Sequence, residues 1–404
     1  MPTLIERIEL KNFLSFGPDS PAVELGPLNV LIGPNGSGKS NLMDALDFVR
    51  TIPTGFGKAA ALVGDPTTAH WRENTALPIE ISVEVNSVIS ELWQYQIRFG
   101  AARESRGQSL RLASEVIHYP GPRVRLGDKL FVQSQLGHLG FRNKRDAPVV
   151  RGFYRSGAAE EAVVVDYDRS ETVFVQLRDP SKDHGISRVG DALGNASNYT
   201  RWSFGRGSNL REPQSVSQPL DRTADDWRNF QPYLNRLCGQ PEKKKAILKY
   251  LDALIPGMED IGVDTLGGRA AIWVTEAGNR LTIDRLSDGT VRVLALLSVL
   301  CDPDPPRLIA LDEPEMGLHP DMIPTLADLL REASERTQVI VTTHSDILVD
   351  CFTATPGVVL VCEKRNGQTH IKPARPSMIP MKKGGQPLGL GVQWLRGTIG
   401  GKRW

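Results

Sequence analysis

GPNGSGKS, at residues 33–40, follows the apolar run LNVLI of residues 28–32. The next stretch, 41–49, is apolar at positions 42, 45, 46 and 49, which is the spacing of one helix face. The order is therefore strand, glycine-rich turn and helix, the context that a G-x-x-x-x-G-K-[ST] motif requires. The alternative is a chance glycine turn before a helix, and the presence of both flanking elements argues against it.

The residues of this turn suit a bound triphosphate. Glycines allow backbone N–H groups to converge on an anion with no Cβ in the way, and the helix directs its partial positive end at the same place. We predict that the Lys39 ammonium reaches the β- and γ-phosphates and that the Ser40 hydroxyl binds Mg²⁺. The remaining nucleotide contacts are predicted to come from Asn35, Gly36, Ser37, Gly38 and Asn41.

A second apolar run, Leu308–Leu311, is followed directly by Asp312 and Glu313. If this run is a strand of an α/β sheet, the two acids emerge at its carboxyl end, where such sheets bind ligands. Asp312 is then predicted to hold Mg²⁺, and Glu313 to orient and deprotonate the water that attacks the γ-phosphate. The alternative is an acidic surface turn, but two charges directly after a fully apolar strand need a partner such as a metal.

Two shorter motifs are compatible with the same site. Ser287 and Gly289 precede the apolar stretch 291–300, so both are expected at a helix N-terminus, which favours anions. His344 ends the apolar run 338–343, where its imidazole is placed to hydrogen-bond a γ-phosphate. Each motif is weak alone, because a Ser-Asp-Gly sequence is usually a turn and a lone histidine is usually structural. Together with the first two motifs, in this order, they form a specific set.

The chain as a whole predicts an α/β protein. Strands are predicted at 4–10, 23–25, 28–32, 78–85, 95–99, 307–311, 338–343 and 358–362. Helices are predicted at 41–49, 241–254, 291–300 and 322–333. The segment 51–77 is predicted to be a loop, and the polar segment 178–225 to be loops or a partly mobile insertion. Strands and helices alternate in the final third, which indicates a parallel sheet.

The composition is typical of an ordinary globular protein, with 40% hydrophobic and 24% charged residues. No apolar run approaches the roughly 18 residues of a membrane helix. Because the N-terminus is charged where a signal peptide is apolar, we expect a cytosolic chain with no membrane partner. The four cysteines form no CxxC pair and are expected to be free thiols.

Basic residues are unevenly distributed in a chain whose net charge is +1. Residues 98–155 contain twelve Lys/Arg against four Asp/Glu, and residues 364–404 contain nine Lys/Arg and no acid. Such stretches suit the phosphate backbone of DNA. They suit equally well a solvated surface that faces an acidic part of the same fold, and charge alone leaves both interpretations open.

These motifs together resemble those of the ABC-type ATPases, in the branch shared by SMC, RecF and the overcoming-lysogenization-defect (OLD) nucleases, often described as AAA-domain ATPases. The stretches ERIELKNFLSF at 6–16, IPGMEDIGVD at 255–264 and LRGTIGGKRW at 395–404 also carry the resemblance. It implies a P-loop ATPase head with a mixed central sheet, an antiparallel β subdomain and an inserted mixed or helical lobe. The implied division is 1–100 for the N-terminal part of the head, 101–244 for a basic, loop-rich insertion and 245–404 for the C-terminal part.

The resemblance also implies roles for several residues. Ser287–Thr290 match the signature loop, Gly317–Pro320 match the D-loop region, and His344 matches the switch histidine. In ATPases of this kind the signature serine caps the γ-phosphate held by the other subunit, so a head-to-tail dimer encloses two ATP molecules. The implied ligands are ATP and Mg²⁺, the implied partner is a second copy of the chain, and Lys39, Glu313 and His344 are the implied catalytic residues.

The sequence departs from the family pattern at several points. No Q-loop glutamine can be assigned, although Gln94 and Gln96 lie near the expected region. No acidic run after His344 matches the Toprim nuclease of OLD proteins, so we expect any nuclease to be a separate polypeptide. Residues 143–146 spell the guanine-specificity motif N-K-x-D, but they precede the acidic strand instead of following it, so we expect ATP and not GTP.

Two functions from different classes fit these observations. The first is an ATP hydrolase whose ATP-dependent dimer acts on DNA, in DNA repair or anti-phage defence, and the basic stretches favour it. The second is an ATP-gated scaffold or sensor that controls a separately encoded nuclease or toxin, and the lack of a second catalytic motif favours it. A transporter motor is disfavoured, because the segment between Lys39 and Asp312 is longer than the compact spacing of a transporter subunit.

Overall fold

The computed structural model describes residues 3–87, 92–104, 107–118, 132–134, 137–139, 149–156, 159–166, 171–176, 185–205, 207–375 and 388–400. The N-K-x-D motif at 143–146 lies outside these residues, as do parts of both basic stretches and of the segment 178–225. Within the described ranges, no helix combines the length and the apolar character that crossing a bilayer requires.

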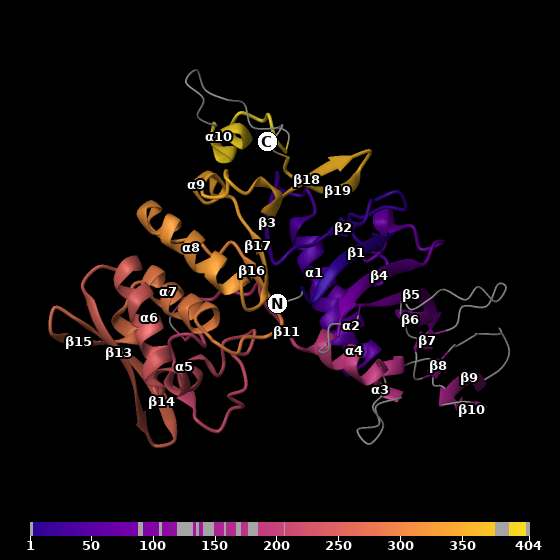
Figure 1. Cartoon of the computed structure of the whole chain (residues 1–404), viewed down its shortest axis with the longest axis horizontal. Coiled ribbons are helices and arrows are strands. Elements are labelled where there is room, and N and C mark those ends of the chain that lie inside the picture. The colour runs from indigo at the N-terminus through magenta and orange to yellow at the C-terminus, as the bar shows by residue number, and fades with distance from the viewer. Residues whose placement is uncertain are drawn as a thin grey trace.

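A six-stranded sheet forms the centre of the molecule (Figure 1). Its strands in spatial order are β11 (Ala196–Tyr199), β16 (Leu308–Asp312), β17 (Gln338–Thr342), β3 (Leu28–Ile32), β18 (Val359–Arg365) and β19 (Gln368–Pro373). The first five strands are parallel, and β19 is antiparallel to β18. The predicted mixed central sheet is therefore confirmed, with the early strand β3 between two strands from the last quarter of the chain.

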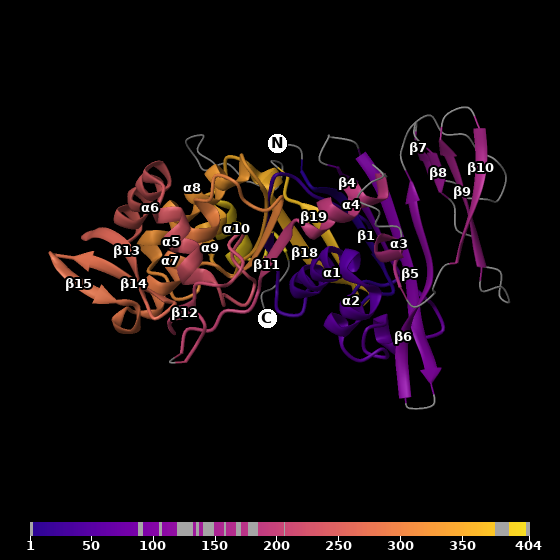
Figure 2. The same ribbon diagram turned by 90° about the horizontal axis from the view of Figure 1, so that it is seen from below.

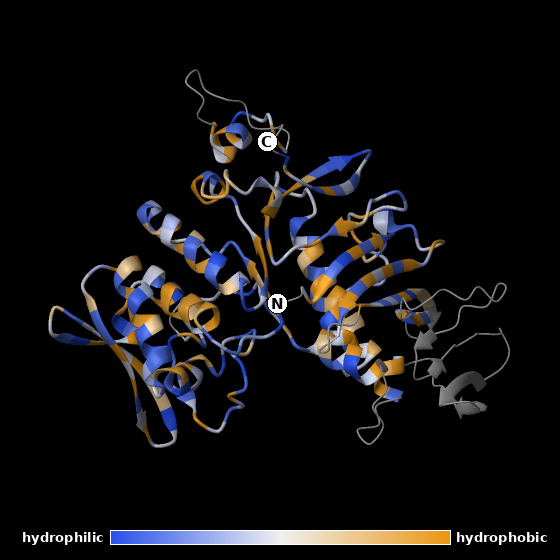
Figure 3. Ribbon diagram, viewed as in Figure 1, coloured by the Kyte–Doolittle hydropathy of each residue, from blue (hydrophilic) through white to orange (hydrophobic). Residues whose placement is uncertain are grey.

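Side chains of these strands alternate between two hydrophobic cores, one on each face of the sheet. Ile309 and Val339 belong to the core that contains the helices α7 (Asp288–Leu300) and α8 (Ile323–Ser334). Ala310 and Ile340 belong to the core formed with α1 (Lys39–Thr51). Figure 1 shows the same layers, with α7 and α8 on one side of the sheet and α1 on the other. Because both faces are covered, the strands are apolar at consecutive positions (Figure 3).

A five-stranded antiparallel sheet packs against α1, which confirms the predicted antiparallel subdomain. Its strands in spatial order are β2 (Val23–Glu24), β1 (Ile5–Lys11), β4 (Ile79–Asn86), β5 (Leu92–Glu104) and β6 (Gly107–His118). Phe48 of α1 stacks on Phe99 of β5, with ring centroids 4.8 Å apart. Two further antiparallel pairs are β7 (Val132–Ser134) with β8 (Gly137–Leu139), and β9 (Val149–Ser156) with β10 (Ala159–Asp166).

A second lobe packs on the other face of the central sheet, against α7. It consists of α5 (Phe230–Cys238), α6 (Pro241–Leu254) and the strands β12 (Gln214–Ser215), β13 (Met258–Leu266), β14 (Arg269–Glu276) and β15 (Asn279–Thr282). Figure 2 shows this lobe and the antiparallel sheet at opposite ends of the molecule. The short helices α9 (Asp346–Asp350) and α10 (Leu390–Leu395) pack on each other beyond β17.

Two loop predictions are wrong. Within the predicted loop 51–77, residues Phe56–Val63 form α2. Within 178–225, Gly185–Gly194 form α4, after the single turn α3 (Val173–Gln176), and the following strand β11 is an edge of the central sheet. The sequence of β11, ASNY, is buried at all four positions but is polar at two of them, so no apolar run marks it. Its backbone is fixed instead by the Asp225 carboxylate, which accepts the N–H of Asn198 at 3.1 Å.

The side chain of Gln338, at the start of β17, joins the central sheet to the antiparallel one. Its Oε1 accepts the backbone N–H of Ile5 at 2.9 Å, and its Nε2 donates to the carbonyls of Ile5 at 2.8 Å and Gly26 at 3.0 Å. The residue is 3% exposed. One buried amide therefore bonds three backbone groups, of which the Gly26 carbonyl also accepts a hydrogen bond from Asn29 Nδ2 at 2.7 Å.

We predict that Gln338→Met lowers the free energy of unfolding by about 1–3 kcal/mol, because the Ile5 N–H and carbonyl lose the side-chain amide that bonds both of them. Chemical denaturation followed by circular dichroism measures this loss. Gln240→Met is the matched control, since Gln240 is exposed and such substitutions change stability by about 0.5 kcal/mol or less. Equal stability of the two variants would show that the Gln338 amide does not hold the sheets together.

Candidate nucleotide-binding site

The register of three parallel strands brings the two main motifs together. Asp312 at the end of β16 lies opposite Thr342 of β17, and Thr342 lies opposite Leu31 of β3. Two residues after Leu31 the chain reaches Gly33 and begins the glycine-rich turn. Because the strands are parallel, this turn and the acids after β16 emerge at the same edge of the sheet. Stretches that are far apart in the sequence thus form one site.

The glycine-rich turn is fixed by a chain of hydrogen bonds to the C-terminal hairpin. Asn41 donates to Ser15 Oγ at 2.6 Å, Ser15 Oγ lies 2.6 Å from Thr369 Oγ1, and Thr369 donates to the Ser37 carbonyl at 3.0 Å. Gly38 has φ +109°, and a Cβ on it would lie 2.2 Å from Thr369 Oγ1. Glycine is therefore required at this position. The amide of Asn41, predicted to contact nucleotide, is used here to fix the turn.

Lys39 is 7% exposed, and its ammonium folds back onto the turn. It donates to the carbonyl of Gly33 at 2.8 Å and to that of Pro34 at 3.2 Å. Burial lowers the pKa of Lys39, and the nearby Glu313 and Asp312 carboxylates act in the opposite direction. The lysine and both acids are thus close enough to interact, as the sequence predicts. A phosphate at the turn would supply the negative charge that a poorly solvated ammonium favours.

Glu313 is held in an unusual backbone conformation. Its φ is +45°, a value that costs a non-glycine residue free energy of about 1–3 kcal/mol and is concentrated at functional sites. Its N–H donates to the Thr342 carbonyl at 3.1 Å, which ties the residue to β17. Its carboxylate lies 3.5 Å from the Nε2 atom of His344. The predicted base and the predicted switch histidine are therefore in contact.

The surroundings of Asp312 suit a divalent cation. Thr342 donates to one oxygen of the Asp312 carboxylate. Burial, together with the charges of Asp47 and Asp312, raises the pKa of Asp44, which lies one helical turn after the exposed Ser40. The oxygens of Ser40 and Asp312 are the hard ligands that Mg²⁺ prefers when phosphates complete its coordination. Among the described residues, no group of three His, Cys, Asp or Glu side chains is placed to hold a metal by itself.

Ser287 and Gly289 lie at the predicted helix N-terminus, that of α7. Ser287 Oγ accepts the N–H of Thr290 at 3.1 Å. A Cβ on Gly289 would lie 2.8 Å from the Gly317 carbonyl, so the signature loop packs against the turn that follows the acids. Because α7 and α1 cover opposite faces of the central sheet (Figure 1 and Figure 2), the structure does not bring Ser287 to Lys39 within one chain.

Sequence reasoning missed a group that holds the acidic turn from the α7 side. Arg292 of α7 is 3% exposed and donates to the Glu313 carbonyl at 3.2 Å. Its guanidinium lies over the rings of Trp202 and Phe204, 4.9 and 4.5 Å from their centroids. The Trp202 indole N–H donates to the Asp312 carbonyl at 2.9 Å. Arg292 could have been noticed in the sequence, because it is the only charged residue in the apolar stretch 291–300. No sequence pattern singles out Trp202.

The glutamines near the expected Q-loop region lie outside this site. Gln94 and Gln96 are on β5, where they donate to the carboxylates of Glu84 at 3.1 Å and Glu80 at 2.6 Å. These bonds stabilise cross-strand pairs of the antiparallel sheet. A contact between either glutamine and nucleotide therefore has no support from the structure.

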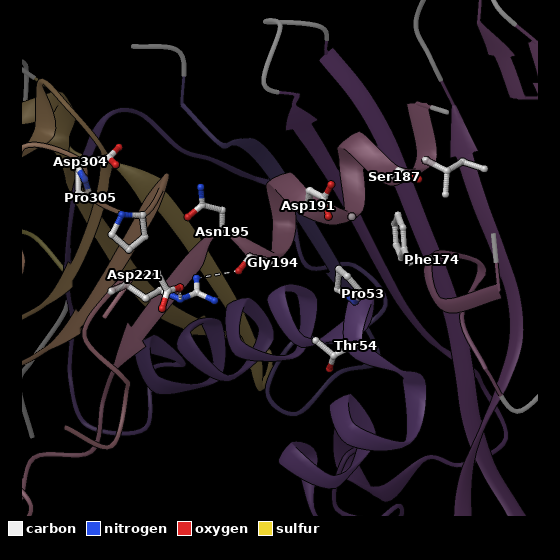
Figure 4. A pocket seen from close by; sticks show the side chains of 14 residues that line it. Pro53, Thr54, Phe174, Ser187, Asp191, Gly194, Asn195, Asp221, Asp304 and Pro305 are labelled. Atoms are coloured by element: carbon white, nitrogen blue, oxygen red, sulfur yellow. Dashed lines mark hydrogen bonds and ion pairs between the residues drawn. The ribbon is translucent and has the colours of Figure 1, made fainter. Parts of the chain in front are cut away.

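A cavity of about 460 Å³ lies at the other end of α1 (Figure 4). Pro53 and Thr54, which follow α1, line it together with Asp191 of α4. Arg222 also lines it, but its guanidinium donates to the Gly194 carbonyl at 3.0 Å. A helix of 13 residues is about 20 Å long, so the cavity is separate from the glycine-rich turn.

One protein-family model matches most of these elements. It is described as "AAA domain, putative AbiEii toxin, Type IV TA system", and it matches residues 28–89 and 166–350, more than half of the chain. The matched ranges contain the glycine-rich turn, the signature loop, the acidic pair and His344. The four motifs singled out from the sequence thus fall within a single family match.

Curated relatives match over short stretches. The chromosome partition protein Smc of Synechococcus sp. (strain ATCC 27144 / PCC 6301 / SAUG 1402/1) is 34% identical over 90 residues, which is 22% of this chain and 7% of that protein. Smc of Methanocaldococcus jannaschii is 53% identical over 45 residues, 11% of this chain and 4% of that protein. The matched region is thus a small fraction of the length of these relatives.

Solved structures of SMC heads match along nearly the whole chain. The SmcHead bound to the C-winged helix domain of ScpA has a TM-score of 0.52 and 18% identity, with 92% of this chain and 97% of that chain covered. The Smc head domain of Pyrococcus furiosus, bound to the C-terminal domain of ScpA, has a TM-score of 0.53 and 16% identity, with 93% and 97% covered. The chain has the fold of the SMC heads and belongs to the AAA-domain family described as putative AbiEii toxin, Type IV TA system.

Proposed function

We propose that this protein is an ATP hydrolase in which bound ATP joins two copies of the chain. The observation that carries the proposal is the register of β3, β17 and β16, which puts Lys39 beside Asp312 and Glu313. A cation at a phosphate-binding turn and a carboxylate base on a nearby strand are the groups that triphosphate hydrolysis needs.

Each residue of the site has a role in this proposal. Lys39 exchanges the carbonyls of Gly33 and Pro34 for the β- and γ-phosphates. Glu313 accepts a proton from the attacking water, and His344, 3.5 Å away, orients that carboxylate and hydrogen-bonds the γ-phosphate. The Ser40 hydroxyl and the Asp312 carboxylate would hold Mg²⁺, which would neutralise phosphate charge when bound.

A second copy of the chain completes the proposed site. Ser287 and Gly289 lie on the face of the central sheet opposite α1, so ATP at Lys39 does not meet the signature loop of its own chain. Ser287 is exposed, and the N-terminus of α7 offers backbone N–H groups to an anion. In a head-to-tail dimer, each Ser287 caps the γ-phosphate of the ATP bound by the partner.

DNA is the proposed partner of this dimer, in DNA repair or anti-phage defence. On the hairpin β18–β19, Arg365 and Lys372 are exposed. Burial lowers the pKa of His370, and the positive charges of Arg365 and Lys372 lower it further, while Glu363, which pairs with Arg365 at 2.9 Å, acts in the opposite direction. The two exposed cations give the hairpin a basic surface. Such a surface attracts a phosphate backbone. The name of the curated relatives, chromosome partition protein, supports the same class of partner.

A second candidate is an ATP-gated scaffold or sensor that controls a separately encoded nuclease or toxin. The description of the family, a putative toxin of a Type IV TA system, favours it. Both candidates share the ATP site and differ in the partner that the dimer engages. ATP turnover without any DNA binding, in the assay given below, would favour the second candidate.

We predict that Lys39→Ala abolishes measurable ATP binding, because removing a buried cation from its phosphate partners costs at least about 2–5 kcal/mol. Isothermal titration calorimetry with ATP and Mg²⁺ measures the effect. Lys58→Ala is the matched control, since Lys58 is exposed on α2, and it is expected to bind like the parent chain. Unchanged affinity of the Lys39 variant would refute the proposed phosphate contact.

We predict that Glu313→Gln keeps ATP affinity but lowers turnover by about 10²–10⁴-fold, because the amide cannot accept the proton of water. ATP should therefore trap the variant as a dimer. Phosphate release and light scattering measure the two effects. Glu335→Gln, at an exposed position after α8, is the control. Turnover of Glu313→Gln at the parent rate would show that another group is the base.

We predict that ATP-dependent DNA binding weakens steeply with salt, because counterions are released from the phosphates. Arg365→Ala combined with Lys372→Ala should reduce the slope of log affinity against log salt by about two. Fluorescence anisotropy with duplex, single-stranded and blunt-ended DNA measures the affinity at each salt concentration. The control pair is Lys245→Ala with Lys249→Ala on α6, both exposed on the other lobe. No binding to any of these DNAs would exclude DNA as the partner.

A further inference from the structure

A second glutamate lies two residues after the proposed base and has a different environment. Glu315 is 8% exposed, and burial raises its pKa. One carboxylate oxygen, Oε1, accepts two hydrogen bonds, from Thr343 Oγ1 at 2.5 Å and from the backbone N–H of His344 at 3.2 Å. Both donors belong to the end of β17. A single buried oxygen therefore connects the acidic turn to the two residues that follow this strand.

The second oxygen, Oε2, is also buried, and within the described part of the chain it has no hydrogen-bond partner. A buried carboxylate costs free energy that an apolar side chain of similar size would not cost. The stabilising contribution of Glu315 therefore comes from the two hydrogen bonds that its Oε1 atom accepts. Without this acceptor, the Thr343 hydroxyl, whose oxygen accepts the Ser345 N–H at 2.9 Å, would lose the acceptor of its own proton, and the His344 N–H would lose this hydrogen bond.

These contacts place Glu315 between the two residues proposed to meet the γ-phosphate. The backbone of His344 is bonded to Glu315, and the ring of His344 lies 3.5 Å from the carboxylate of Glu313. Glu313 and Glu315 are also linked within one turn, since the Met316 N–H donates to the Glu313 carbonyl at 3.1 Å. A shift of the His344 backbone would thus move the imidazole relative to the base.

We infer that Glu315 is a positioning residue for hydrolysis, which fixes His344 against Glu313 by accepting the Thr343 hydroxyl and the His344 N–H. The inference rests on the proposed ATPase function and adds a residue to it. The role requires an acceptor and does not require a charge. Glutamine at 315 keeps the Oε1 acceptor, whereas glutamine at 313 removes the proton acceptor that hydrolysis needs. The same substitution should therefore have opposite effects at these two positions.

The test compares Glu315→Ala, Glu315→Gln and Thr343→Val with Glu313→Gln in the full chain. We expect Glu315→Ala to lower kcat at least about tenfold, since small displacements of catalytic groups cost up to about 100-fold, with the Kd for ATP close to that of the parent chain. Glu315→Gln should restore kcat to within about threefold of the parent. Thr343→Val removes one of the two donors and should give an intermediate kcat.

Two results would overturn the inference while leaving the ATPase proposal intact. One is parent-like kcat for both Glu315→Ala and Thr343→Val. The other is a Glu315→Gln variant as inactive as Glu313→Gln, because a charge and not an acceptor would then be needed. A parent chain without ATP turnover would overturn both proposals. If circular dichroism shows that Glu315→Ala does not fold, Thr343→Val takes its place in the test. This variant replaces a hydroxyl by a methyl group of similar size and changes no charge.

Discussion

The parallel register of β16, β17 and β3 is the constraint on which the candidate site depends. This register sets Asp312, Thr342 and Leu31 side by side on neighbouring strands. The glycine-rich turn, the acidic turn and His344 all follow within a few residues of these three positions. A slip of one residue in any of these strands would exchange its two faces. Because each face is buried in a separate apolar core, such a slip would bury the wrong side chains on both sides. The two cores therefore fix the positions of the polar groups at the edge.

The site brings together charged side chains whose charges the surrounding protein stabilises only in part. Lys39 donates to backbone carbonyls, desolvation and the charges of Asp47 and Asp312 raise the pKa of Asp44, and Glu313 is held at a positive φ. Opposite charges are thus kept near each other, and in the described part of the chain Lys39 bonds carbonyls instead of pairing directly with Asp312 or Glu313. A polyanion with a divalent cation provides the complementary charges to both sides of the site. In this sense the arrangement of these side chains suits a metal-bound triphosphate.

Much of this arrangement could be predicted from the sequence, because the elements that build it are locally encoded. The apolar runs at 28–32, 308–311 and 338–343 each form the expected strand, and the glycine-rich turn forms the expected start of α1. The features that could not be predicted from the sequence depend on contacts between residues far apart in the chain. Strand β11 is polar at two of its four buried positions and relies on Asp225, while Trp202 becomes part of the site only through its bond to the Asp312 carbonyl. Glu315 likewise joins the site through its bonds to Thr343 and His344, which no local pattern marks.

The place of β3 has a consequence for how the protein is made. This strand leaves the ribosome well before its two neighbours, β17 and β18, which follow it in the chain by about 300 residues. Until they are synthesised, both of its edges are unpaired, and the helix α1 can pack only on the antiparallel sheet. Contacts of such long range form slowly, so β3 is an apolar strand at risk of aggregation until β17 and β18 have been made. The glycine-rich turn gains its final surroundings only when synthesis has reached Thr369, whose hydroxyl donates to the Ser37 carbonyl.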